Sequence, residues 1–308
     1  MKNILYRLWK HLDKRPYASS FLRSIHKYLS TKLIKQGKID TFYPLLKKYK
    51  INQAAVLPSY KKFFCLQLFE NVLETLVVGS SHGVYGYWAE EKFHEINACG
   101  ISQDLYYSYE IYKKYADAPR LKNIVIFYSV FSPGFVLEIS YPALCDAYYY
   151  FYEIPYRFRG KTENNDTKEA FSLFVSRIKR YPDFHYIGNT PSPNIKNLTI
   201  EPQKRAKDHL KGNKRNENQT AYIMQAAKLA KEKGHHLYIV IPPGRSDYTS
   251  HLPSFEELFA ELLKLEDQVK ILNFFRDERF SDSDFSDTDH LNEHGAKKLS
   301  AFIRKEMK

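Results

Sequence analysis

Short apolar runs bounded by turn residues recur from residue 72 onward, and stretches with helical spacing of apolar side chains lie between them. The clearest runs are 75–78, 94–98, 123–128, 236–241 and 269–272. Such runs are typical of strands that are covered on both faces, and helices between them fit parallel crossover connections. The pattern therefore predicts an α/β fold in three layers, with a central parallel sheet between helices.

Three segments in this part carry clear helix signals. Residues 219–233 are rich in helix-forming side chains and end at Gly234, a residue type that commonly terminates helices. A second helix is expected to begin at Ser254, because Glu257 three residues later completes a capping-box pattern. A third helix is expected over about 293–306, where apolar side chains recur at helical spacing.

Residues 132–216 are too many for a plain loop of a compact domain. They include an aromatic stretch, Y-P-A-L-C-D-A-Y-Y-Y-F-Y at 141–152, and a helical piece near 167–180. We interpret them as a helical and aromatic insertion within an α/β domain over 71–308. Such an insertion is a natural place for determinants of substrate specificity.

The start of the chain differs from the rest in charge. Residues 1–50 contain thirteen Lys and Arg side chains but only two acidic ones, which gives this segment a net charge of +11 out of the chain's +12. Apolar residues at helical spacing, including Leu5, Leu8 and Leu12, predict a basic amphipathic helix. Residues 1–70 are therefore expected to form a basic helical segment. Residues 1–50 either contact an anionic membrane surface or an acidic polymer, or pack on the main domain with a solvated basic face.

The charge of the remaining chain is nearly balanced, which argues against a main domain that binds nucleic acid. The cysteines, Cys65, Cys99 and Cys145, lack metal-ligand spacing and fit buried thiols in a reducing compartment. Charged residues interrupt every long apolar run, so the sequence predicts neither a signal peptide nor a membrane span. We expect a cytoplasmic protein, peripheral at the inner membrane face if residues 1–50 bind there.

The first predicted strand leads into a candidate catalytic turn, L-V-V-G-S-S-H-G at 76–83. Such a turn exposes a hydroxyl at the carboxyl edge of the sheet, where open α/β sheets bind ligands. Serine becomes a strong nucleophile when a histidine, oriented by a carboxylate, removes its proton. The block F-S-D-T-D-H-L-N at 285–292 supplies this pair before the last helix. We predict Ser81 as the nucleophile, His290 as the base and Asp287 as the residue that orients the base.

The G-S-S-H turn and the D-T-D-H block resemble the first and last motif blocks of SGNH (GDSL-type) hydrolases. The resemblance covers about residues 72–131 and 219–306. It implies an SGNH-like fold and the same three roles for the Ser, Asp and His residues. The acidic residue of the family's Gly-Asp-Ser turn is replaced by Ser80 in this sequence.

The resemblance also implies where an oxyanion would be bound. The family's second block supplies a glycine, which corresponds to Gly100 in I-N-A-C-G-I-S-Q-D-L. Its third block supplies an Asn that has no match in F-Y-S-V-F-S-P-G at 127–134. Either Ser129 or Ser132 replaces that Asn, or the oxyanion hole is built from Ser81 and Gly100 alone.

Two further residues are candidates for contact with the substrate. Arg245, in I-P-P-G-R-S-D-Y, follows a predicted strand at the carboxyl edge of the sheet, and an ordinary proline-rich turn is the alternative. His209 lies in a basic stretch and could contact an anionic substrate, although a solvated basic face is the simpler interpretation. No metal site is expected, because the acidic loop has Asp287 where the sharp turn of an EF-hand needs Gly.

The resemblance implies acyl transfer through an acyl-Ser81 intermediate. Some SGNH-type proteins encoded with bacterial surface-polysaccharide genes are O-acetyltransferases, so we expect acetylation of a capsular or other surface polysaccharide or oligosaccharide, with an anionic glycan as one candidate. Acetyl-CoA is the expected acyl donor, and no bound cofactor is expected. The alternative is a carbohydrate esterase with the same triad and water as acceptor. A catalytically inactive glycan-binding protein is disfavoured by the complete Ser-Asp-His set.

Overall fold

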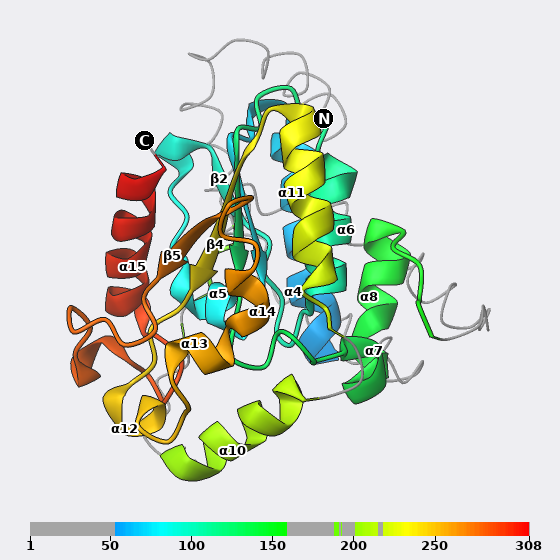
Figure 1. Cartoon of the computed structure of the whole chain (residues 1–308). Helices are drawn as coiled ribbons and strands as arrows, with labels where there is room; N and C mark the ends of the chain where they lie inside the picture. The colour runs from blue at the N-terminus through cyan, green and yellow to red at the C-terminus, as the bar shows by residue number, and fades with distance from the viewer. Residues whose placement is uncertain (1–52, 159–187, 191, 193–200, 215–217, 308) are drawn as a thin grey trace, which may run out of the picture. The chain divides into compact units, whose positions relative to one another are not determined.

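The computed structural model describes residues 53–158, 188–190, 192, 201–214 and 218–307 (Figure 1). The chain divides into two units, and the described residues from Ala54 onward belong to the larger one. Residues 1–52 of the predicted basic helical segment 1–70, and the helical piece near 167–180, lie outside the described residues.

Five parallel strands form one sheet in the order β2–β1–β3–β4–β5. They are β1 (Thr75–Gly79), β2 (Glu95–Asn97), β3 (Asn123–Phe127), β4 (His236–Ile241) and β5 (Lys270–Asn273). Each coincides with one of the predicted strands, so the expected α/β fold with a central parallel sheet is confirmed. Strand β1 is buried along its whole length, which explains why its sequence shows no polar alternation.

Helices cover both faces of the sheet (Figure 1). On one face, α6 (Leu105–Tyr115) packs against α11 (Ala221–Lys233), and on the other, α15 (Glu293–Glu306) packs against α5 (Ser81–Gly86). Helix α4 (Gln53–Phe69) contacts α8 (Pro142–Tyr152) through aromatic rings. The other helices are α7 (Leu137–Ser140), α10 (Pro202–Asn213), α12 (Ser246–Thr249), α13 (Phe255–Leu258), α14 (Ala260–Leu263), and the 3₁₀ turns η1 (Glu70–Val72), η2 (Glu91–Phe93) and η3 (Asp282–Asp284).

Two of the predicted helices are confirmed and the third is divided. Helices α11 and α15 match the predicted ranges, and Gly234 ends α11 with a φ of 71°. The helix predicted from Ser254 is instead two short ones, α13 and α14, separated at Phe259. The buried Phe259 ring packs near Tyr128 and Phe275, with ring centroids 6.1 and 5.6 Å away. Tertiary packing here overrides the local helix signal.

The strand order reverses at β1, because β2 lies on one side of it and the later strands follow on the other. In open parallel sheets, ligands bind at the carboxyl ends of the strands beside such a reversal. The segment that leaves β1 at this edge contains Ser80 and Ser81, and the segment that leaves β3 contains Ser129. The fold therefore brings the candidate catalytic turn to the edge where a site is expected.

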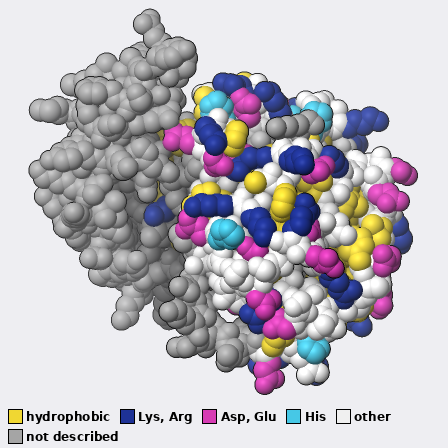
Figure 2. All heavy atoms as spheres, turned by 90° about the vertical axis from the view of Figure 1, so that its left-hand side faces the viewer, with side chains coloured by type: hydrophobic (Ala, Val, Ile, Leu, Met, Phe, Trp, Pro, Cys, Tyr) yellow, Lys and Arg dark blue, Asp and Glu magenta, His cyan; other side chains and the backbone are white. Residues whose placement is uncertain are grey.

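Several surface charges are paired with one another. On the face drawn in Figure 2, Lys and Arg side chains are interspersed with Asp and Glu side chains. In and beside α15, Lys297 lies 2.6 Å from a Glu293 oxygen and Lys298 lies 2.9 Å from an Asp284 oxygen.

Among the helices that the structure describes, none has the length and apolar character needed to cross a membrane.

Candidate active site

Gly79 sets the turn that presents Ser81 at the start of α5. Its φ is 142°, and a Cβ atom there would lie 2.7 Å from the Cβ of Phe127 on strand β3. Only glycine accommodates both this conformation and this close approach. Ser80 follows in an extended conformation, and Ser81 is the first residue of the helix. Ser81 is partly exposed, whereas Ser80 and His82 on either side of it are buried.

The loop before α15 is a tight turn organised by Asp287. A bridge between Phe285 and Leu291 closes its base. One carboxylate oxygen of Asp287 accepts hydrogen bonds from the backbone N–H groups of Asp289 (3.0 Å) and His290 (2.7 Å). A short polar side chain that accepts from the backbone ahead of it is a common way to stabilise a turn. Asp287 thus fixes the backbone of His290 and also contacts its ring.

Ser81, His290 and Asp287 lie in one hydrogen-bonded line. The Ser81 Oγ lies 2.9 Å from His290 Nε2, and His290 Nδ1 lies 2.8 Å from Asp287 Oδ2. Because a carboxylate only accepts, the ring donates its Nδ1 proton to Asp287, and the Ser81 hydroxyl donates to the free Nε2. The structure thus brings together the predicted nucleophile, base and orienting carboxylate, although Ser81 and His290 are 209 positions apart.

The charges around this line favour transfer of the Ser81 proton to His290. Burial lowers the pKa of His290, but the charge of Asp289, together with the hydrogen bond and charge of Asp287, outweighs burial and raises that pKa above its usual value. Burial raises the pKa of Asp287, but its hydrogen bond and charge interaction with His290 outweigh burial and hold that pKa below its usual value. The site therefore stabilises the imidazolium that forms when a serine is activated.

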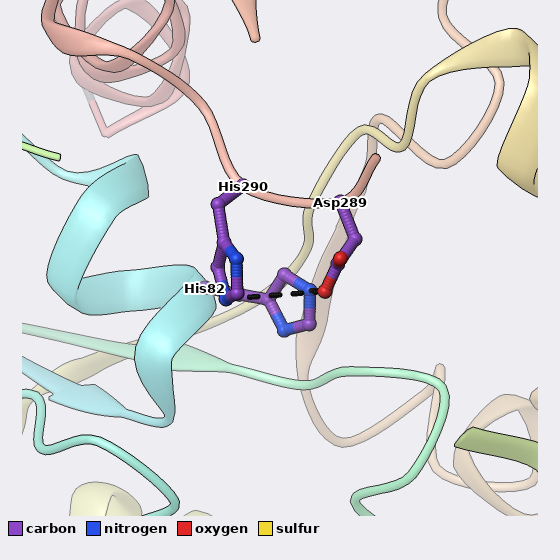
Figure 3. Close-up of side chains that lie close together, drawn as sticks. All are labelled: His82, Asp289 and His290. Carbon is purple, nitrogen blue, oxygen red and sulfur yellow. Dashed lines mark hydrogen bonds and ion pairs between the residues drawn. The ribbon is translucent and has the colours of Figure 1, made fainter. Parts of the chain in front are cut away.

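A second histidine–carboxylate pair lies behind the first. His82 Nε2 lies 3.1 Å from Asp289 Oδ2, and His82 Nδ1 lies 2.7 Å from the hydroxyl oxygen of Ser129. The rings of His82 and His290 are stacked, with centroids 5.0 Å apart and planes inclined by 28°. Figure 3 shows Asp289 and His290 on one loop, with His82 meeting Asp289 from helix α5. His82, which follows the predicted nucleophile Ser81, therefore contacts Asp289, which precedes the predicted base.

Helix α10, from the predicted insertion, reaches the same carboxylate. Arg205 donates to both oxygens of Asp289, with Nε–Oδ1 and Nη2–Oδ2 distances of 2.9 and 3.0 Å. His209, one turn further on, has its Nε2 3.8 Å from Asp289 Oδ2 and its Nδ1 2.6 Å from the Tyr248 hydroxyl oxygen. Burial, partly offset by the charge of Asp289, lowers the pKa of His209 to about 3. Helix α10 thus places one cation and one neutral imidazole around Asp289.

The predicted oxyanion donors need correction. The Gly100 N–H donates to the Gly79 carbonyl at 2.9 Å, so it is engaged in extending the strand pairing. Ser129 is buried, its N–H donates to the Ser132 hydroxyl oxygen at 2.8 Å, and its own hydroxyl is part of the buried network. Neither Gly100 nor Ser129 has a donor free for an oxyanion. The N–H of Ser81, at the first position of α5, has no acceptor among the described residues.

The two predicted substrate contacts lie beside the site in different environments. The role of His209 as a substrate contact stays a prediction, but His209 is 7% exposed, so it is not part of a solvated basic face. The reason is helical spacing, because His209 shares the inner face of α10 with Arg205, while Lys207 lies on the exposed face. Arg245 adjoins the site through its backbone N–H, which donates to the Thr288 carbonyl at 3.1 Å. Its guanidinium is held by Asp247, and a substrate role for Arg245 stays a prediction.

The same cluster contains residue types that bind metals. His82, Asp289 and His290 offer ligand atoms within 4.8 Å of one another. Arg205, however, already meets both oxygens of Asp289 with its positive charge. Both nitrogens of each imidazole are also hydrogen-bonded within the protein. The cluster is therefore organised around an internal cation and fits proton transfer better than coordination of a metal ion.

The sequence did not indicate that His82, Asp289 and Arg205 belong to this cluster. His82 and Asp289 directly adjoin Ser81 and His290 in the sequence, and this adjacency was the available signal. Arg205 gave no comparable signal, because its position depends on the path of the insertion.

A scan of the chain against models of known protein families finds no match, and neither does a search of curated proteins. The function is therefore inferred from the residues at the site.

Proposed function

We propose that this protein is an SGNH-type serine acyltransferase in which Ser81 carries the acyl group. The observation that supports this most directly is the hydrogen-bonded line, with Ser81–His290 and His290–Asp287 distances of 2.9 and 2.8 Å. The partly exposed position of Ser81 at the carboxyl edge of a parallel sheet adds support. The resemblance of the G-S-S-H and D-T-D-H blocks to SGNH hydrolases favours this family over other serine enzymes.

In the proposed first step, Ser81 Oγ attacks the carbonyl carbon of the acyl donor while His290 Nε2 takes the hydroxyl proton. The new C–O bond produces a tetrahedral oxyanion, to which the N–H of Ser81 can donate. Collapse of this intermediate breaks the bond to the leaving group, which receives the proton from His290. With acetyl-CoA as the donor, the products are acetyl-Ser81 and the free thiol of coenzyme A.

In the second step, His290 takes the proton of an acceptor hydroxyl, whose oxygen attacks the ester carbonyl of acetyl-Ser81. The C–O bond to Ser81 breaks, and His290 returns the proton to the serine oxygen. We propose a hydroxyl of a bacterial capsular or other surface polysaccharide or oligosaccharide as the acceptor, by analogy with SGNH-type O-acetyltransferases. With water as the acceptor, the same two steps describe a carbohydrate esterase.

Incubation with acetyl-CoA followed by intact-protein mass spectrometry tests the first step. We expect part of the protein to gain the mass of one acetyl group, and peptide mapping to locate that group on Ser81. Addition of candidate glycans should discharge it, and acetylated glycan then supports the transferase whereas acetate alone supports the esterase. p-Nitrophenyl acetate serves as a second donor. Absence of acyl-Ser81 and of turnover with both donors would contradict the proposed chemistry and favour a glycan-binding protein.

The pH dependence of the reaction provides a separate prediction. His290 must be neutral to accept the Ser81 proton, and its pKa is raised above the usual value of 6.5. We therefore expect kcat/KM for p-nitrophenyl acetate to decline with falling pH already above the ordinary histidine value. Initial rates measured from about pH 5 to pH 9 give the midpoint of this acid limb. A midpoint below the ordinary value would contradict the role of His290 in this charge environment.

A further inference from the structure

Asp289 is a buried carboxylate outside the Ser81–His290–Asp287 line. It is 2% exposed and accepts from Arg205 at both oxygens, from His82, and from the Thr288 hydroxyl at 3.0 Å. A buried carboxylate is costly unless it is paired and hydrogen-bonded, and each oxygen here has two donors. The Oδ2 atom of Asp289 also lies 3.8 Å from His290 Nε2. This negative charge is therefore fixed next to the nitrogen that is proposed to take the serine proton.

The hydrogen-bond directions around Asp289 determine the state of His82. Because the carboxylate only accepts, His82 Nε2–H donates to Asp289, and His82 Nδ1 accepts from the Ser129 hydroxyl. The Ser129 oxygen is then left to accept from the Ser80 hydroxyl, at 3.1 Å. Burial lowers the pKa of His82, in agreement with a neutral ring. A neutral imidazole, tied to Asp289, thus stacks on the ring of His290.

We propose that Asp289 and Arg205 are positioning residues for His290, so that helix α10 of the insertion completes the catalytic site. The proposal rests on the proposed function and deepens it by assigning a second carboxylate to the same site. Asp289 holds the His82 ring against His290 and places a negative charge beside the imidazole. Arg205 holds Asp289 in place through two hydrogen bonds and limits the effect of its charge.

The two members of this ion pair have opposite electrostatic effects on His290. The charge of Asp289 favours the protonated form of the His290 ring, whereas the charge of Arg205 disfavours it. Neutralising Asp289 should therefore move the titration of His290 to lower pH, and neutralising Arg205 should move it to higher pH. An ion pair remote from His290 that served only to hold the fold together would leave this titration unchanged. Among the described residues, the titratable groups that face His290 are Asp287 and Asp289 on its own loop, His82 and Tyr85 on α5, and Arg205 and His209 on α10.

The test compares the wild type with Asp289→Asn and Arg205→Gln. Imidazole NMR signals give the titration midpoint of His290, whose signal is recognised among those of the eleven histidines by its loss in His290→Gln. We expect the midpoint, and the acid limb of kcat/KM for p-nitrophenyl acetate, to move to lower pH in Asp289→Asn and to higher pH in Arg205→Gln. We also expect kcat to fall about tenfold or more in both variants, because the ring of His290 is less well oriented.

Glu95 and Arg304 provide a matched control pair. Their Nε–Oε1 and Nη2–Oε2 distances are both 2.8 Å, and the Glu95 side chain is 1% exposed, which resembles the geometry and burial of the Asp289 pair. Glu95→Gln should lower thermal stability without moving the His290 midpoint. Midpoints that stay at the wild-type value in both test variants, or that move in the same direction, overturn the proposal. Midpoints that move as expected without Ser81-dependent turnover in the wild type support the network and contradict the proposed reaction.

Discussion

Ser81→Ala is expected to lower kcat by roughly 10⁴-fold or more while the fold persists. The change removes one oxygen from a partly exposed side chain and leaves His290 Nε2 without the hydroxyl that donates to it at 2.9 Å. No covalent intermediate can form, so the acetyl mass on the protein should disappear together with turnover. Hydrolysis of p-nitrophenyl acetate and intact-protein mass spectrometry measure the two effects, and circular dichroism checks that the fold is unchanged.

Ser80→Ala is the matched control for this substitution, because it makes the same chemical change at the neighbouring position. The buried Ser80 hydroxyl is bonded to Ser129 at 3.1 Å and lies at the far end of the buried network. We expect Ser80→Ala to reduce kcat by less than about tenfold. If Ser80→Ala lost activity and Ser81→Ala kept it, the nucleophile would be misassigned.

Gly79→Ala is expected to reduce the free energy of unfolding by roughly 2–5 kcal/mol. Two effects combine, because alanine is strained at a φ of 142° and its Cβ would lie 2.7 Å from the Cβ of Phe127. Strands β1 and β3 would have to separate at the point where Ser81 is presented, so kcat of the folded fraction should also fall. Urea unfolding followed by circular dichroism measures the loss of stability.

Gly234→Ala provides a comparison at a positive φ without a close neighbour. Gly234 also has a positive φ, of 71°, but a Cβ atom there would meet nothing within 4 Å. We expect this variant to lose only about 1 kcal/mol, the cost of the backbone conformation alone. Equal losses in Gly79→Ala and Gly234→Ala would show that the approach of β3 does not constrain the catalytic turn.

The strands could be predicted from the sequence because the sheet is buried on both faces. The run around Leu76 and Val77 is uninterrupted in its apolar character, since both residues are fully buried between layers. The division of the helix after Ser254 could not be predicted in this way. It depends on how the ring of Phe259 packs against side chains from other segments.

The same distinction applies to the candidate site. Ser81 and His290 could be predicted because both lie in segments that follow strands, Ser81 after β1 and His290 in the loop between β5 and α15. In a parallel sheet, such segments begin at the same edge. The oxyanion donors could not be predicted from residue type, because the N–H of Gly100 is committed to Gly79 by the pairing of the strands. The proposed role of Arg205 depends on where the chain of the insertion returns to the sheet. The spacing of apolar residues in the sequence does not indicate where that return occurs.

The hydrogen bond between Ser81 and His290 joins residues 209 positions apart. Contacts of such long sequence separation are entropically costly to close, and proteins rich in them fold slowly, so we expect this contact to form late in folding. Strands β3 and β4 lie between β1 and β5 in the sheet, so we expect these strands to pair before the loop that carries His290 docks beside β1. We therefore expect the serine to stay chemically inert during refolding until the sheet is complete. Recovery of ester hydrolysis should then lag behind the recovery of secondary structure, so that turnover reports the last stage of folding.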